Sequence, residues 1–152
     1  MRSVPHTTLV YTSRIFLVPK RDSQAVRPVV DMSALDRYIL NPKFRMLTVH
    51  QIRQTMRPLA WMVSLDFSDA YWHAPVHRRF QPFLAIPLQG HPYVFQRLPF
   101  GLNIAPRVFT KIVRQALLPL LAEGLSIYYY LDDWVILVES PSQCLADLEK
   151  VV

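Results

Sequence analysis

The sequence predicts an α+β fold, built from short antiparallel strands and a small number of helices. Three observations lead to this prediction. Apolar, β-branched and aromatic runs come in pairs around short polar turns, which is typical of hairpins. One long segment, 105–124, has its apolar residues at helical spacing. Thirteen prolines interrupt the chain, so most other helices must be short.

The chain of 152 residues is long enough for one domain with a buried core. Apolar residues make up 51% and charged residues 18%, which is typical of a folded protein. The single cysteine, Cys144, excludes an internal disulfide and favours a reducing, intracellular compartment, either cytoplasmic or nuclear. The sequence shows neither a signal peptide nor an apolar run long enough to span a bilayer, so we expect no membrane partner.

The net charge of +6 is unevenly distributed along the chain. Residues 1–114 carry 16 of the 17 basic residues against five acids, a net charge of +11, whereas residues 115–152 have a net charge of −5. A basic region suits a polyanion such as nucleic acid, and an acidic spot suits metal cations. Charge by itself also fits a solvated basic surface.

Three segments in the first half of the chain have the composition of strands: 13–20, 26–32 and 61–67. A polar turn joins the first two as a hairpin. A helix is expected over 48–56, with Thr48 as its N-cap and Pro58 as its end. The segment 68–74 can form only a short helix, because Pro75 stops it.

Four segments in the second half also match strands: 83–88, 93–98, 125–131 and 134–139. Gln89 and Gly90 are expected to join the first pair as a hairpin. The segment 105–124 predicts the longest helix, with a kink at Pro119. A last helix is expected over 141–152.

Two adjacent carboxylates, Asp132 and Asp133, lie at the expected tip of the last hairpin, where Asn-Gly or Asp-Gly would be usual. Neighbouring like charges are unfavourable alone, and a bound cation offsets that cost. Mg²⁺ takes hard oxygen ligands, commonly one or two carboxylates. Asp66, at the end of an earlier predicted strand, is the further acid that such a site needs. The alternatives are an exposed polar turn for the pair and a helix-capping or strand-edge acid for Asp66.

Four segments resemble the motifs of reverse transcriptases, in the right order, between residues 14 and 140. The box YLDD, 130–133, matches their Tyr-x-Asp-Asp, and LDFSDAYW, 65–72, resembles the first palm motif. The segment 98–109, LPFGLNIAPRVF, resembles their Leu-Pro-x-Gly segment, and 16–36 resembles the fingers hairpin. The sequence is similar to retrotransposon enzymes of the long-terminal-repeat and DIRS-type groups.

The resemblance implies a single reverse transcriptase domain fragment over 1–152, with part of the fingers at about 10–60 and the palm at about 61–152. The palm would be an antiparallel sheet backed by helices, and the thumb and ribonuclease H regions of a parent polyprotein would be absent. The implied activity is RNA-directed DNA polymerase: deoxynucleoside triphosphates are added to a primer 3′ end on an RNA or DNA template.

The resemblance also implies two Mg²⁺ ions, with Mn²⁺ as a substitute, that activate the primer hydroxyl and stabilise the attacking and leaving oxygens. Their ligands carry over to the side chains of Asp66 and Asp132 and to the backbone carbonyl of Phe67. Asp133 matches the second acid of the box and supports the site. All three acids are the expected catalytic residues.

For nucleotide binding, the resemblance assigns Lys20 and Arg27 to the triphosphate, Lys as a point charge and Arg as a fork. The alternative is a surface basic pair, with Arg27 paired to Asp31. Tyr71 matches the aromatic floor under the incoming sugar, which excludes a 2′-hydroxyl and favours deoxynucleotides; its alternative is a core tyrosine. The other nucleotide-binding residues that the resemblance implies are Asp69, Ala70, Phe100 and Gly101.

Phe100 replaces the Gln of retroviral enzymes and Leu131 replaces their Met, which bears on the subgroup more than on the activity. Six further basic residues could follow a template–primer backbone: Arg78, Arg79, Arg97, Arg107, Lys111 and Arg114. Zinc at His73 and His77 is disfavoured, because Pro75 separates them and a third ligand is not evident. The three tryptophans are interpreted as core or rim packing: Trp61, Trp72 and Trp134.

Two other functions are weighed against polymerisation. One is an inactive retroelement remnant that only binds nucleic acid; the intact motif acids argue against long decay, whereas a missing thumb would leave this piece weak or inactive alone. The other is an RNA-dependent RNA polymerase, which Tyr71 and a box that begins with Tyr rather than Gly disfavour.

Overall fold

The computed structural model describes residues 1–3, 10–19, 26–55 and 61–151. Predicted features outside these ranges include Lys20, the polar turn over 21–25 and the helix end at Pro58. Within them, helices and antiparallel strands are mixed along the chain, so the predicted α+β class is confirmed.

The chain forms two compact units, each built from two separate segments. Unit 1 comprises Met1–Pro42 and Tyr71–Pro106, and unit 2 comprises Lys43–Ala70 and Arg107–Val152. The division into fingers and palm stays a prediction.

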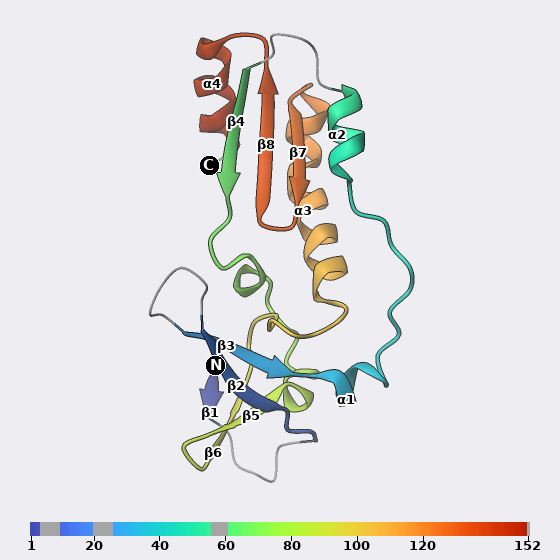
Figure 1. The fold of residues 1–152 in the computed structure, drawn as a ribbon, viewed down its shortest axis with the longest axis vertical. Coiled ribbons are helices and arrows are strands. Elements are labelled where there is room, and N and C mark those ends of the chain that lie inside the picture. The colour runs from blue at the N-terminus through green and yellow to red at the C-terminus, as the bar shows by residue number, and fades with distance from the viewer. Residues whose placement is uncertain (4–9, 20–25, 56–60, 152) are drawn as a thin grey trace. The chain divides into compact units, whose positions relative to one another are not determined.

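Unit 1 contains two antiparallel sheets (Figure 1). In one, β2 (Arg14–Pro19) pairs with β3 (Val26–Asp31). In the other, β6 (His91–Val94) lies between β1 (Arg2–Ser3) and β5 (Ala85–Leu88). The short helices in the described part of unit 1, or adjoining it, are α1 (Ser33–Asp36) and the 3₁₀ helices η2 (Ala70–His73) and η3 (Gln81–Phe83).

The two hairpins of unit 1 match the predictions in part. The β2–β3 hairpin is confirmed, and so is the turn between β5 and β6. The second strand was expected over 93–98, and this is wrong, because it begins directly after the turn and ends at Val94. From Gln96 onward the chain pairs elsewhere: the Leu98 amide donates to the Ala74 carbonyl (2.9 Å), and the Val76 amide donates to the Gln96 carbonyl (2.9 Å).

Gly101 lies against the backbone of β3, inside unit 1. Its φ of +100° is in the left-handed region, and a Cβ at this position would overlap the carbonyl oxygen of Val30. The local packing therefore requires glycine, whatever other role the residue has.

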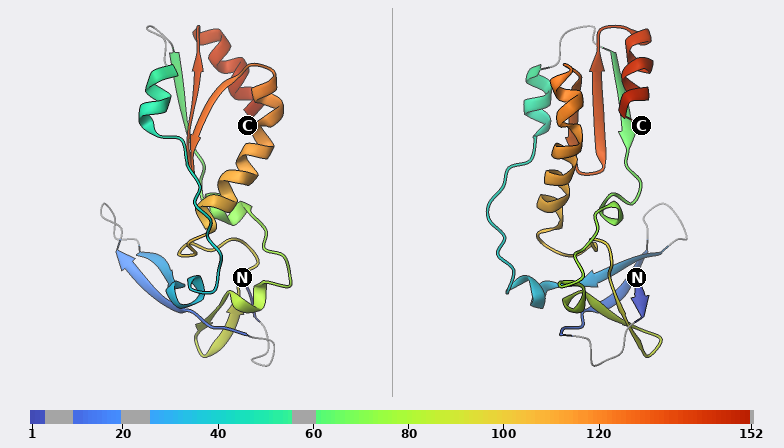
Figure 2. Two further views of the ribbon diagram at one scale, coloured as in Figure 1. Left: turned by 90° about the vertical axis from the view of Figure 1, so that its right-hand side faces the viewer. Right: turned by 180° about the vertical axis from the view of Figure 1, so that it is seen from behind.

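Unit 2 is built on an antiparallel sheet of three strands in the order β4-β8-β7. The strands are β4 (Trp61–Asp66), β7 (Ser126–Tyr130) and β8 (Asp133–Val138). The helices α3 (Ala105–Ala122) and α4 (Pro141–Val151) cover one face of this sheet (Figure 2). All of these elements were predicted, with ends that agree or differ by at most two residues.

The remaining helix of unit 2 is α2 (Val49–Thr55). Thr48 is its N-cap, as predicted: its hydroxyl accepts a hydrogen bond from the Gln51 amide (3.3 Å), and its own amide donates to Gln51 Oε1 (2.9 Å). This reciprocal arrangement is a capping box, which fixes where the helix begins. Across the described ranges, no helix is both long enough and apolar enough to cross a membrane.

The two faces of the unit 2 sheet differ in character, because side chains alternate along each strand. Ile127, Trp134 and Ile136 share one face and are buried. On this side the long helix α3 presents its buried residues at helical spacing: Phe109, Val113 and Leu117. The other face carries the exposed Asp66 and Asp133. One face therefore forms the core of unit 2, and the other presents carboxylates to solvent.

Candidate metal centre and basic cavity

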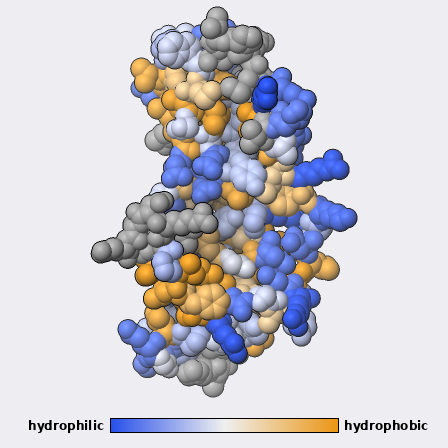
Figure 3. Space-filling view, viewed as in Figure 1, coloured by the Kyte–Doolittle hydropathy of each residue, from blue (hydrophilic) through white to orange (hydrophobic). Residues whose placement is uncertain are grey.

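The three predicted acids lie at one end of the unit 2 sheet, where β4 ends and β8 begins (Figure 1). Asp66 is directly opposite Asp133 in the antiparallel register. Directly opposed residues point to the same face, with Cβ atoms about 4.5–5.5 Å apart. Asp132 precedes Asp133 in the adjoining turn. Hydrophilic side chains gather at this end of the sheet (Figure 3). The strand order thus brings together acids that are far apart in the sequence.

The turn of this hairpin differs from the prediction. Both acids were expected at the tip, but Asp133 is the first residue of β8 and pairs with Tyr130. The two-residue loop is therefore Leu131-Asp132, and of these only Leu131 has a positive φ, +55°. A positive φ at the first loop position alone is typical of a type II′ turn, which ordinarily carries Gly there. Leu131, rather than either acid, takes the unfavourable backbone conformation.

Phe67 joins the end of β4 to the acidic turn. Its amide donates to the Asp132 carbonyl oxygen over 2.8 Å. Its ring stacks on Trp134, with centroids 5.3 Å apart and planes 15° apart, and lies 6.3 Å from the ring of Phe109 in α3. The residue after Asp66 is thus tied both to the acidic turn and to the apolar core.

The electrostatics of this end of the sheet favour a cation. Like charges directly opposite each other on neighbouring strands are destabilising, and Asp66 and Asp133 are so placed. In the described part of the chain, no three His, Cys, Asp or Glu side chains form a preassembled metal cage. The carboxylates are nevertheless the oxygen donors that Mg²⁺ prefers, and Mg²⁺ is usually held by one or two carboxylates together with substrate phosphates and water. The donor set therefore fits this ion.

Tyr129 lies beside the acidic turn, on the face that packs against α3. It is opposite Trp134 in the register, with ring centroids 6.4 Å apart. Burial raises the pKa of Tyr129 above its ordinary value, and the nearby charge of Arg114 partly opposes this. The neutral phenol is thus the form that the folded chain favours.

The predicted nucleotide-binding residues are divided between the two units. In unit 1, Tyr71 is 9% exposed and its ring centroid is 4.8 Å from that of the exposed Phe100. This burial agrees with the core-tyrosine alternative, and a role toward a sugar stays a prediction. In unit 2, Asp69 is exposed, with a positive φ of +54°, and Ala70 is buried.

The triphosphate-binding pair is only partly within the described structure. Arg27 belongs to β3 and is opposite Val18 in the register. Asp31, its possible partner, accepts hydrogen bonds from the amide and the hydroxyl of Ser33, which hold the pKa of Asp31 below its ordinary value.

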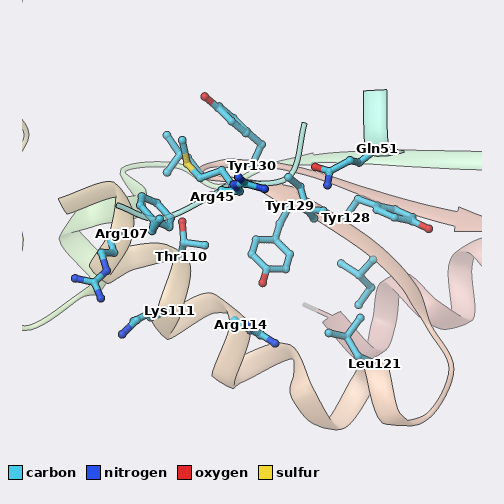
Figure 4. A pocket seen from close by; sticks show the side chains of 15 residues that line it. Arg45, Gln51, Arg107, Thr110, Lys111, Arg114, Leu121, Tyr128, Tyr129 and Tyr130 are labelled. Atoms are coloured by element: carbon cyan, nitrogen blue, oxygen red, sulfur yellow. The ribbon is translucent and has the colours of Figure 1, made fainter. Parts of the chain in front are cut away.

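A cavity of about 560 Å³ lies within unit 2, between α3, β7 and the segment before α2. Figure 4 shows Arg107, Lys111 and Arg114 extending from α3 and Tyr129 pointing toward this helix. Three of the six predicted phosphate-contacting residues thus line one cavity. The other three, Arg78, Arg79 and Arg97, are exposed in unit 1.

Polar residues with no role predicted from the sequence also line the cavity, among them Arg45 and Gln51. Arg45 lies near Tyr130 (Figure 4). The sequence offers only one indication of a role for Arg45, which is that it belongs to the basic segment 1–114. Gln51 had been placed on the helix but without a role. The Nε atom of Arg107 is buried and has no hydrogen-bond partner among the described residues, which leaves a donor available to an anion.

Comparison with known protein families gives a match over most of the chain. The family model described as "Reverse transcriptase (RNA-dependent DNA polymerase)" matches residues 18–152. The Pol polyprotein of transposon 412 from Drosophila melanogaster is 25% identical over 146 residues, which are 93% of this chain and 12% of that protein. Protein P of a duck hepatitis B virus is 29% identical over 100 residues, which are 62% of this chain and 13% of that protein. The chain therefore spans a small part of the curated relatives it matches.

Solved structures give a similar result. The protease–reverse transcriptase of prototype foamy virus is 26% identical, with a TM-score of 0.79 over 94% of this chain and 19% of that chain. A form of the foamy viral protein in complex with double-stranded DNA is 28% identical, with a TM-score of 0.81 over 94% of this chain and 24% of that chain.

Proposed function

Because the chain belongs to the reverse transcriptase family, we propose that it provides the catalytic core of an RNA-directed DNA polymerase within a retrotransposon Pol polyprotein. In this reaction a primer 3′ hydroxyl attacks the α-phosphate of a deoxynucleoside triphosphate opposite a template base, and pyrophosphate leaves. The observation that carries the proposal is the pairing of Asp66 with Asp133, next to Asp132. Two acids directly opposite each other destabilise the sheet by charge repulsion, and metal ions bound between them in a polymerase would offset this repulsion.

The proposed metal ligands are the carboxylates of Asp66 and Asp132 and the carbonyl of Phe67, with Asp133 in support. Two Mg²⁺ ions held there would supply charge neutralisation at the reacting phosphate. The chain's own contribution is placement. The sheet fixes Asp66 and Asp133 opposite each other, and the Phe67 amide fixes the Asp132 carbonyl. Phosphoryl-type transfer depends mainly on such positioning of the catalytic groups before the reaction.

The proposed nucleotide-binding residues are Lys20, Arg27, Asp69, Ala70, Tyr71, Phe100 and Gly101. Lys20 and Arg27 would hold the triphosphate, and Tyr71 would favour a deoxyribose over a ribose. The contact between the rings of Tyr71 and Phe100 supports their action as one surface. For Gly101, the overlap with Val30 already explains why glycine is present.

The basic cavity of unit 2 is the proposed contact for the template–primer backbone. Arg45, Arg107, Lys111 and Arg114 place four cations around one cavity, with tyrosines among them. Phosphate contacts of this kind are insensitive to sequence and weaken with salt. Arg114→Glu should weaken template–primer binding and reduce its salt dependence, whereas Arg53→Glu, on the exposed surface of α2, should have less effect.

The activity is tested by primer extension on an RNA template with Mg²⁺. The 152-residue chain and the longest product of its reading frame are compared, each with and without Asp132→Asn. We expect extension by the longer product and its reduction by about a thousandfold in the variant, since several kcal/mol of charge stabilisation would be lost. Glu149→Gln, an exposed acid on α4, is the matched control and should leave extension unchanged.

The outcomes separate polymerisation from its main alternative. For the 152-residue chain alone we expect salt-sensitive binding of template–primer without processive synthesis. Extension by the longer product that Asp132→Asn leaves intact would refute the metal assignment. Binding by both forms with no extension by either would instead support the inactive, nucleic-acid-binding remnant.

A further inference from the structure

Trp134 follows the two acids and is the second residue of β8. Its side chain is 7% exposed and lies on the face of the sheet opposite to Asp66 and Asp133. The other two tryptophans are largely exposed, Trp61 at 55% and Trp72 at 48%. Trp134 is therefore the buried one of the three. Its indole N–H must find an acceptor inside the unit, since an unpaired buried donor is costly.

The acceptor is the backbone of the acidic turn. The Nε1–H of Trp134 donates to the Leu131 carbonyl oxygen over 3.0 Å. This carbonyl belongs to the peptide bond between Leu131 and Asp132. The indole therefore restrains the orientation of this peptide plane, and with it the direction of the Asp132 side chain. Leu131 is also the residue that holds a positive φ, +55°. The hydrogen bond thus supports the one strained position of the loop.

A second contact extends this support to Asp66. The Phe67 ring stacks on the indole, and the Phe67 amide donates to the Asp132 carbonyl oxygen. The two carbonyls on either side of Asp132 are thus held by neighbouring groups, one by the indole and the other by the residue after Asp66. Moving the indole would disturb both strand ends that carry the acids.

We propose that Trp134 is a positioning residue that holds the Leu131–Asp132 peptide and so sets the placement of Asp132 relative to Asp66. The inference rests on the proposed function, because it expects that Trp134 affects the binding of a metal ion by these acids. It also makes a claim about the turn that can be measured without any metal or substrate.

The test uses Trp134→Phe in the 152-residue chain. Phenylalanine keeps an aromatic ring in the core but lacks the N–H. Amide hydrogen exchange is followed by nuclear magnetic resonance at Phe67, whose amide reports the turn, and at Ile136, whose position in the middle of β8 reports opening of the whole sheet. We expect exchange at Phe67 to rise about fivefold, the effect of one lost hydrogen bond, with little change at Ile136. Trp61→Phe, on the exposed edge of β4, should change neither.

A second measurement uses Mn²⁺ alone as the probe. Site-specific broadening of the Asp66 and Asp132 amides gives the affinity, and we expect Trp134→Phe to weaken it roughly tenfold, as loss of a supporting hydrogen bond around metal ligands does. Trp61→Phe should bind as the wild type does.

The outcomes for Trp134 and for the proposed function are distinguishable. Exchange at Phe67 that stays at the wild-type rate in Trp134→Phe overturns the positioning role, whatever Mn²⁺ shows. Equal acceleration at Phe67 and Ile136 also overturns it, since the residue would then only stabilise the core. A wild-type chain without site-specific Mn²⁺ broadening contradicts the proposed function, and the exchange rates still decide the role of Trp134.

Discussion

In the part of the chain that the structure describes, two hairpins have strands joined by two residues, and their turns use different residues. In unit 1, Gln89 and Gly90 join β5 to β6 with positive φ at both positions, +51° and +78°. In unit 2, Leu131 and Asp132 join β7 to β8, and the left-handed position is held by leucine. Glycine holds one of the two left-handed positions of the first turn, with Gln89 at the other, whereas the second turn has no glycine.

The difference indicates what each turn is selected for. A glycine in the left-handed region avoids the steric cost that a side chain meets there, so Gly90 suits the turn of unit 1, although Gln89 beside it meets that cost. The turn of unit 2 meets that cost at Leu131 with no glycine beside it, and it adds an acid opposite another acid. Backbone strain and charge repulsion that the surrounding structure stabilises are more frequent at functional sites than elsewhere. Here they coincide at the proposed metal ligands.

The largest expected effect comes from giving the second turn the residues of an ordinary hairpin. The double change Leu131→Asn with Asp132→Gly should abolish Mn²⁺ binding at this end of the sheet. It should also raise the free energy of unfolding by about 1 kcal/mol, because a favoured turn replaces a strained one. Chemical denaturation and Mn²⁺ line broadening measure the two quantities. Retained Mn²⁺ binding would show that Asp132 is not a ligand.

A smaller effect is expected from glycine substitutions, which sharpen the comparison from the other side. Gly90→Ala should cost about 1 kcal/mol, because its Cβ would meet no atom within 4 Å and only the backbone conformation is penalised. Gly124→Ala, equally open and left-handed in unit 2, is its matched control. Gly101→Ala should cost more, about 3 kcal/mol, since the overlap with Val30 is added.

The glycine predictions are checked by chemical denaturation. Gly90→Ala should leave Mn²⁺ binding unchanged, because its turn carries no proposed ligand. Similar losses for Gly101→Ala and Gly90→Ala would show that unit 1 relaxes around the added methyl group, and that the close approach to β3 does not require glycine.

The smallest expected effect is a pH dependence that belongs to the β7–β8 hairpin. Burial raises the pKa of Tyr129 above 10.0, so the folded chain holds this proton more tightly than the unfolded chain does. The associated stability is complete below pH 10.0 and is lost as the pH rises through the higher, folded pKa. Between pH 10.0 and the folded pKa, the free energy of unfolding should therefore fall more steeply for the wild type than for Tyr129→Phe.

Denaturation at a series of alkaline pH values measures this slope. Tyr38→Phe, which removes a tyrosine that is 87% exposed in unit 1, is the control and should follow the wild type. Parallel curves for the wild type and Tyr129→Phe would contradict the assigned effect of burial.

Most elements could be predicted from the sequence because their signals are local. Helical spacing of apolar residues predicted α3, and paired β-rich runs predicted the β2–β3 and β7–β8 hairpins. The bounds of β6 could not be predicted, because Gln96 and Leu98 hydrogen-bond to Val76 and Ala74. The alternation of residues does not reveal this tertiary pairing. The composition of a short β-rich segment does not decide which of two neighbouring segments it pairs with.

The site shows the same limit. The motifs indicated the candidate acids, but they did not predict the position of the turn. The Asp pair suggested that both acids form the loop, whereas the loop consists of Leu131 and Asp132. Arg45 lines a cavity together with residues distant in sequence, and the indole of Trp134 donates a hydrogen bond to a backbone carbonyl. Neither kind of contact leaves a pattern in a single sequence.

The interleaved arrangement of the two units bears on how the chain is made. β4 is an edge strand that pairs only with β8, and the whole second segment of unit 1 lies between them in the sequence. During synthesis, Asp66 emerges long before the strand that will face it. No single cut in the chain releases an intact unit together with an intact remainder. Such distant pairing is slow to form, so the acidic end of the sheet should be among the last regions to become ordered.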